Sequence, residues 1–212
     1  WQLAGWLLPL VPGPGKRRSR NPLSMLSLWK LFDNLRRSLV PAGLTLLLLL
    51  GWTVLPHAWL WTLAVIAILA LPATSAFVLD MVRKPDEVLL RQHLAATTSV
   101  AGRHVAQTVL TLAFLPYEAS VNLDAIARTA WRMLVTHRRL LEWNPSANEL
   151  PDRRHRNEPP GRFELAASVN SMWIAPVIAT ASAIQIGATA PSALAMAGPI
   201  LILWFVAPGI AW

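Results

Sequence analysis

Two long stretches of this 212-residue chain carry no Asp, Glu, Lys or Arg. They cover residues 38–79 and 165–212, and each is long enough for two helices of the roughly 20 apolar residues that cross about 30 Å of hydrocarbon. The pattern predicts an all-α membrane protein with about four transmembrane helices in two hairpins, joined by amphipathic interfacial helices.

The first transmembrane hairpin is expected over residues 39–79. Its spans run from about Leu39 to Leu55, with Pro41 in the first turn, and from about Ala58 to Leu79. Only two residues separate the spans, so they should be antiparallel. Tryptophans near this turn are expected to mark the outer headgroup level, namely Trp52, Trp59 and Trp61.

The second transmembrane hairpin is expected within residues 165–212. Its spans cover about 169–189 and 192–212, and the chain turns without any charge at Ala190 and Pro191. These spans are rich in Ala, Gly, Ser and Thr, and small residues allow helices to approach closely in lipid.

The segments before the first hairpin are not apolar enough to span. Residues 1–15 are short and broken by proline, and we expect them at the membrane interface. Residues 16–38 begin with a basic run and continue with leucines at helical spacing, with charged residues on the remaining surface. This pattern predicts a basic amphipathic helix lying in the interface.

Residues 80–164 are predicted to form a cytoplasmic or interfacial helical region that ends in a basic loop. One long helix is expected from about Leu94 to Arg132. It either lies along the cytoplasmic interface or spans, as a fifth membrane helix within 94–132. Spanning would place one of the two flanking basic patches on the disfavoured side of the membrane, so the pattern favours the interface.

Glu118 and Asn122 form a polar membrane or interface pair one helical turn apart within that helix. An ionisable side chain within a membrane is costly and is by default a candidate for function. The alternative is a carboxylate satisfied by Arg103, by Asn122 or by interfacial water.

The charge balance supports a membrane topology. The chain has 19 Lys and Arg against 11 Asp and Glu, for a net charge of +8, and a mean hydropathy of +0.43. Its basic residues flank the apolar runs, which indicates cytoplasmic basic loops and no nucleic-acid partner. The chain has no cysteine, which excludes disulfides and thiolate metal sites.

Motifs for catalysis are scarce in this sequence. It contains no Gly-rich phosphate loop, HExxH or GxSxG, and the residues alone therefore indicate a membrane scaffold. A transporter module is the alternative, but a transporter should show an internal repeat and a polar midplane site. The Leu-rich first hairpin and the Ala-rich second one are not convincingly similar.

Four strings of the sequence carry a resemblance to a known family. They are WQLAGWLLP at 1–9, NPLSMLSLWKLFDNLRRSLVPAGLTLLLLLGWTVLP at 21–56, LPYEASVNLDAIARTAWRMLVTHRRLLEW at 115–143 and MWIAPV at 172–177. In order and spacing they resemble the membrane portion of bacterial cyclic β-1,2-glucan synthases. The resemblance covers essentially the whole chain.

This resemblance implies a role beside an enzyme domain. In that family an inverting glycosyltransferase domain extends a β-1,2-linked glucan from UDP-glucose. A region related to glycoside phosphorylases controls chain length, and helices hold the assembly in the inner membrane. We therefore expect an internal piece of a longer protein, with the lipid bilayer, the rest of the parent chain and the growing glucan as its partners.

The resemblance also assigns the N-terminal residues. Residues 1–15 resemble the tail of the transferase domain, and Trp1 and Gln2 would follow the motif that closes it, beside the glucan acceptor. The Arg-Gly-Asp that precedes them in the family is absent here. The catalytic carboxylates and a divalent metal, Mg²⁺ or Mn²⁺, are expected in the parent transferase domain, so this segment should hold no catalytic residue, metal site or cofactor.

Overall fold

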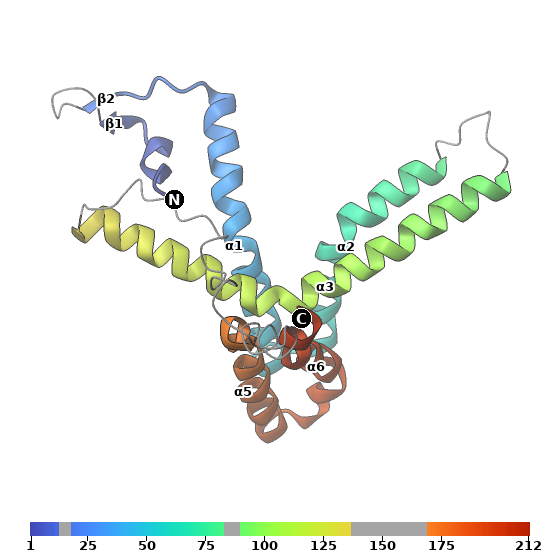
Figure 1. Ribbon diagram of the computed structural model, residues 1–212. Helices are drawn as coiled ribbons and strands as arrows, with labels where there is room; N and C mark the ends of the chain where they lie inside the picture. The colour runs from blue at the N-terminus through green and yellow to red at the C-terminus, as the bar shows by residue number, and fades with distance from the viewer. Residues whose placement is uncertain (13–17, 83–89, 137–168) are drawn as a thin grey trace, which may run out of the picture. The chain divides into compact units, whose positions relative to one another are not determined.

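The computed structural model describes residues 1–12, 18–82, 90–136 and 169–212 (Figure 1). These residues are mostly helical, and three of their helices are long and apolar enough to cross a membrane, which confirms the predicted all-α membrane class. The chain divides into two compact units. One comprises Trp1–Ala42 with Glu118–Glu164, and the other Gly43–Tyr117 with Leu165–Trp212.

Helix α1 spans Met25–Thr53 and joins two elements that the sequence separated. The predicted interfacial helix and the first span form one continuous helix, with Pro41 in its interior and not in a first turn. Ser24 caps the start, because its hydroxyl oxygen accepts a hydrogen bond from the Ser27 N–H at 3.2 Å. Strong helix formers fill the junction around Ser38, so the single hydrogen bond lost at the proline does not end the helix.

Helix α2 spans Ala58–Val82 and follows α1 after the short turn that the sequence predicted, and the two helices contact each other near that turn. The Trp52 indole N–H donates to the Thr62 hydroxyl at 2.9 Å. A Cβ at Gly51 would lie 2.5 Å from the Cβ of Trp61, so glycine is required for this approach. The prediction for Trp52 needs correction, since its ring is buried by protein and does not face the headgroup layer.

Helix α3 spans Leu90–Trp131 and continues into a short π-helix, η3, at Arg132–Thr136. The single long helix expected from the sequence is confirmed. Pro116 lies inside it and cannot donate to the carbonyl of Leu112 four residues earlier. The buried indole N–H of Trp204 donates to that carbonyl at 2.9 Å.

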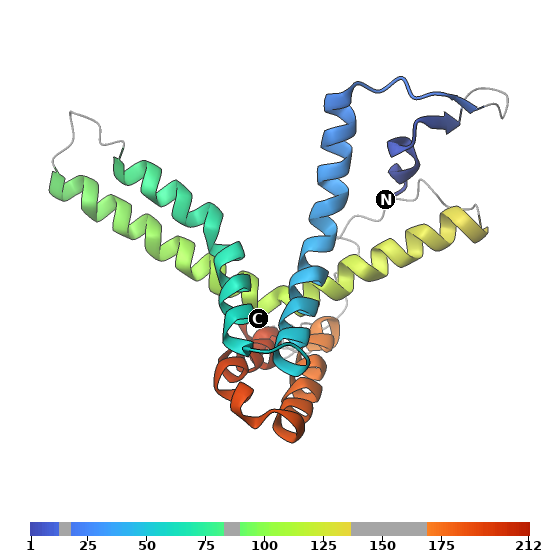
Figure 2. The same ribbon diagram turned by 180° about the vertical axis from the view of Figure 1, so that it is seen from behind.

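Helices α5 (Ile174–Thr189) and α6 (Leu194–Ile210) are antiparallel neighbours in both views of the molecule (Figures 1 and 2). A 3-10 turn, η6 (Pro191–Ala193), joins them at the predicted position. Small residues form most of the buried stripe that α5 contributes, as the sequence predicted. Its members are Ala175, Ala179, Ser182 and Ile186.

The first span of this second hairpin is shorter than expected. Residues 169–172 are helical, a turn follows at Trp173, and α5 then runs for 16 residues, about 24 Å at 1.5 Å each. Pro176 explains the interruption, because it has no N–H for the carbonyl of Met172 and its ring crowds that carbonyl. The described residues therefore hold three long apolar helices and one shorter one, where about four spans were expected.

The N-terminal residues form structure that the sequence did not predict. A 3-10 helix, η1 (Ala4–Leu7), precedes a two-stranded antiparallel sheet of β1 (Leu10–Pro12) and β2 (Arg18–Arg20). We expected residues 1–15 only to lie at the membrane interface, because prolines are more typical of turns than of strands. Lys16 and Arg17 of the basic run, and the predicted loop up to residue 164, lie outside the described residues.

Candidate functional site

Asn21 attaches the N-terminal segment, residues 1–8, to the start of α1. Its side-chain amide donates to the carbonyl oxygens of Trp6 at 2.6 Å and of Leu8 at 3.0 Å. Its side-chain oxygen accepts the N–H of Leu23 at 2.9 Å, which is the Asx turn expected of Asn before a helix. One polar side chain thus fixes both the turn and the segment beside it.

Trp1 makes a second attachment further along α1. Its indole N–H donates to the hydroxyl of Ser38 at 2.8 Å, and that hydroxyl donates to the carbonyl of Leu35 at 2.7 Å. The N-terminal segment is therefore held against α1 at two points, one just before the helix begins and one after its third turn.

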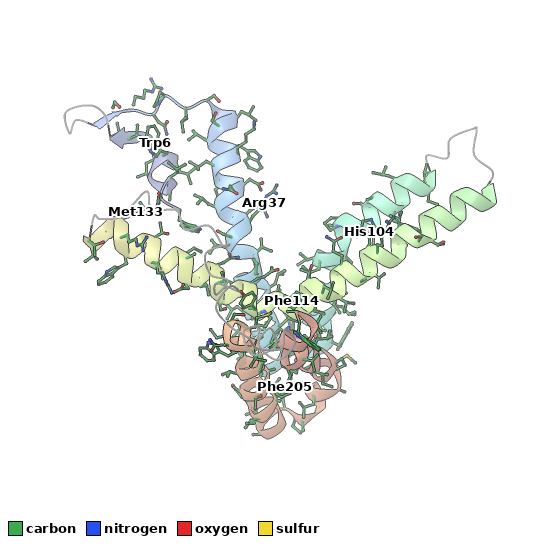
Figure 3. The ribbon with its side chains drawn as sticks, in the orientation of Figure 1. Trp6, Arg37, His104, Phe114, Met133 and Phe205 are labelled. Carbon is green, nitrogen blue, oxygen red and sulfur yellow. The ribbon has the colours of Figure 1, made fainter. Side chains whose placement is uncertain are left out.

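A groove of about 760 Å³ lies where this segment faces α1. We call it the η1–α1 groove. Figure 3 shows Trp6 on η1 and Arg37 on α1, the two elements that contribute its walls. The lining residues are Leu3, Trp6, Leu23, Ser27, Lys30, Leu31, Asp33, Asn34 and Arg37. Its α1 wall follows the three- and four-residue spacing that places side chains on one face of a helix.

The charges of the η1–α1 groove do not cancel. The Asp33 carboxylate accepts hydrogen bonds from Arg36 and Arg37, each at 2.8 Å. Arg37 uses its Nε for that pair and keeps 74% of its side chain exposed. Within the described part of the chain, Lys30 has no ion pair. The groove is thus a cationic surface with an apolar wall.

The predicted acceptor residues, Trp1 and Gln2, belong to the same N-terminal segment. Trp1 keeps 38% of its surface exposed but is tied to Ser38, and Gln2 is exposed. Neither lines the η1–α1 groove, and their role at a glucan acceptor stays a prediction. Sequence reasoning missed the groove itself. The sequence does show a helical spacing of polar residues on α1, at Ser27, Lys30, Asn34 and Arg37. Residues 1–8, however, show no periodicity that would predict their packing against α1.

Glu118 and Asn122 lie one turn apart on α3, as the sequence predicted. The described residues offer Glu118 no hydrogen bond or ion pair, so neither Arg103 nor Asn122 satisfies its carboxylate. Partial removal of water by neighbouring atoms raises the pKa of Glu118 above its usual value. Neither Glu118 nor Asn122 lines any of the pockets found among the described residues.

Metal-ligating side chains do not gather in the described ranges, which contain no group of three His, Asp or Glu placed to hold an ion.

Comparison with known proteins confirms the resemblance. The chain is 29% identical, over its whole length, to the cyclic β-(1,2)-glucan synthase NdvB of Rhizobium meliloti (strain 1021). It spans 7% of the length of that protein. No protein-family model matches the chain.

Proposed function

We propose that this chain is part of the membrane region of a cyclic β-1,2-glucan synthase, where it anchors a UDP-glucose-dependent glycosyltransferase in the bacterial inner membrane. The observation that carries the proposal is similarity to NdvB over the entire chain, combined with three long apolar helices. Anchoring is the role that follows most directly from helices of this length and composition.

The outer surfaces of α1 and α2 support a lipid environment. Large apolar side chains are exposed along both helices, for example Leu46 at 56% and Ile68 at 51%. Contiguous apolar surface of this kind is rare on soluble proteins because water solvates it poorly. In a bilayer the same side chains face hydrocarbon at no such cost.

The chemistry of synthesis belongs, in this proposal, to the transferase domain of the parent protein. That domain would bind UDP-glucose and a divalent metal, and would supply the carboxylate that accepts the proton of the acceptor hydroxyl. The present chain supplies the membrane attachment. Trp1 and Gln2 would lie where the transferase meets the membrane, close to the growing glucan.

The anchoring role can be tested with substitutions that a helix exposed to water would tolerate and a membrane-spanning helix would not. In the complete synthase, Leu46→Arg with Ile68→Arg places two charges on lipid-facing surface, each costing about 2.5 to 3.5 kcal/mol at a helix centre. We expect this variant to leave the membrane fraction and to lose membrane-associated incorporation of labelled glucose from UDP-glucose.

The matched control is Leu46→Ala with Ile68→Ala, which shortens the same side chains without adding charge. It should retain both membrane association and glucose incorporation. An arginine variant that stays in the membrane fraction with undiminished incorporation would contradict the proposal, because exposed arginines are tolerated only where the surface faces water.

A further inference from the structure

We propose that the η1–α1 groove binds the headgroup of an anionic phospholipid, with the phosphate at Lys30 and Arg37. This inference goes beyond the proposed function and shares with it only the premise that α1 enters a membrane. It concerns a specific lipid site, in addition to the general attraction between basic loops and membranes.

Charge complementarity is the first argument. Lys30 and Arg37 lie seven residues apart, so both project from the same face of α1. Arg37 pairs with Asp33 through Nε, which leaves its terminal nitrogens for another acceptor. Arginine and lysine are the side chains that bind phosphate most effectively. A neutral sugar chain would leave the net positive charge of the groove uncompensated.

Depth in the membrane is the second argument. Helix α1 has 29 residues, about 43 Å, whereas the hydrocarbon core is about 30 Å thick. The uncharged stretch begins directly after Arg37. If Leu39 marks the hydrocarbon boundary, Arg37 lies about 3 Å outside it and Lys30 about 13 Å outside it. Arg37 is then at the headgroup layer, and the flexible side chain of Lys30 reaches toward it.

The apolar wall is the third argument. Leu3 and Trp6 contribute from the N-terminal segment, and Leu23 and Leu31 from the α1 side. These side chains lie N-terminal to Arg37 and therefore outside the hydrocarbon, where they suit the headgroup and glycerol region of a lipid and not its acyl chains. Tryptophan is also the aromatic residue that favours the headgroup level.

Lipid retention gives a direct test. The complete protein is placed in bilayers of equal parts phosphatidylcholine and phosphatidylglycerol, and the lipids that remain bound are counted by native mass spectrometry. The wild-type protein should retain phosphatidylglycerol selectively. Lys30→Gln and Arg37→Gln should each lower that selectivity about fivefold, and the double variant about 25-fold, since each surface charge contributes comparably to anionic lipid binding.

Arg128→Gln is the matched control. Arg128 pairs with the acidic residue four positions before it and keeps 72% of its side chain exposed, as Arg37 does with 74%. The control should retain phosphatidylglycerol like the wild type. Equal loss in the control, or unchanged retention in the double variant, would overturn the proposal.

A photoreactive p-benzoylphenylalanine at Leu31 identifies the occupant of the groove. Adducts enriched in phosphatidylglycerol over phosphatidylcholine support the proposal, provided that the same probe at Trp29, which does not line the groove, shows no enrichment. Adducts with glucan, or with a peptide from elsewhere in the protein, would overturn it. Lipid adducts that contain phosphatidylglycerol and phosphatidylcholine in equal amounts would also overturn the proposal.

Discussion

At the scale of single residues, Pro116 shows how this chain tolerates proline inside a helix. The proline leaves the carbonyl of Leu112 without its helical donor, and the buried indole of Trp204 supplies the missing hydrogen bond. The ring of Trp204 also packs against Trp52, with centroids 5.6 Å apart. The hydrogen bond lost at Pro116 was predictable from the sequence. The indole of Trp204, 92 positions away from Leu112, was not predictable as the replacement donor.

Glu118 gives a prediction for pH dependence. Its pKa is raised in the folded protein, so the folded state holds the proton more tightly than the unfolded state. The Glu118 carboxyl therefore stabilises the folded state at pH values below its pKa in the unfolded state. This stabilisation is lost as pH rises through its pKa in the folded state. We expect Glu118→Gln to raise the melting temperature relative to the wild type at neutral pH, with the difference vanishing in acid.

The measurement is thermal unfolding of the complete protein in detergent across that pH range. Asn122→Ala is the control, since it changes the neighbouring polar residue without removing an ionisable group. Its pH dependence should match that of the wild type. A difference between Glu118→Gln and wild type that is the same at every pH would show that the carboxylate does not titrate as argued.

At the scale of elements, the sequence predicted most helices but fewer of their boundaries. Hydrophobic length correctly indicated α2, the long α3 and the turn at Ala190 and Pro191. It did not reveal that α1 continues through Ser38, because a change from amphipathic to fully apolar composition does not require a break in the backbone. The η1–α1 groove was missed for a related reason, since one of its walls is an irregular segment positioned by Asn21.

The α1–α2 hairpin yields a prediction about close helix packing. Gly51→Ala places a Cβ within 2.5 Å of the Cβ of Trp61, and neither atom can rotate away. We expect a loss of about 1 to 3 kcal/mol in the free energy of unfolding, typical of overpacking. Gly43→Ala is the matched control, because nothing lies within 4 Å of its added Cβ. It should be neutral or stabilising by up to about 1 kcal/mol, through helix propensity.

Both alanine variants can be compared by denaturant unfolding of the complete protein in the same detergent. The expected order of stability is Gly43→Ala at or above wild type, and Gly51→Ala below it. Equal stability of the two variants would mean that α1 and α2 do not approach as closely as the structure shows.

At the scale of the whole molecule, the open question of topology concerns α3. Its longest stretch without Asp, Glu, Lys or Arg covers residues 104–117, about 21 Å of helix, which is less than the roughly 30 Å of hydrocarbon. At least one of Arg103 and Glu118 would therefore have to enter a bilayer that α3 crossed. The basic patches on either side of α3 argue in the same direction, since both favour the cytoplasm.

The absence of cysteine from this chain makes that topology directly measurable. In a complete protein freed of any other cysteine, single cysteines at Glu87 and Ser146 bracket α3, and both positions lie outside the described residues. We expect a membrane-impermeant maleimide to label both in inverted inner-membrane vesicles and neither in intact spheroplasts, because both patches would be cytoplasmic. A cysteine at His57, in the turn between α1 and α2, should show the reverse pattern. Labelling of Glu87→Cys and Ser146→Cys from opposite sides would mean that α3 crosses the membrane, and one basic patch would then be on the side that the charge distribution disfavours.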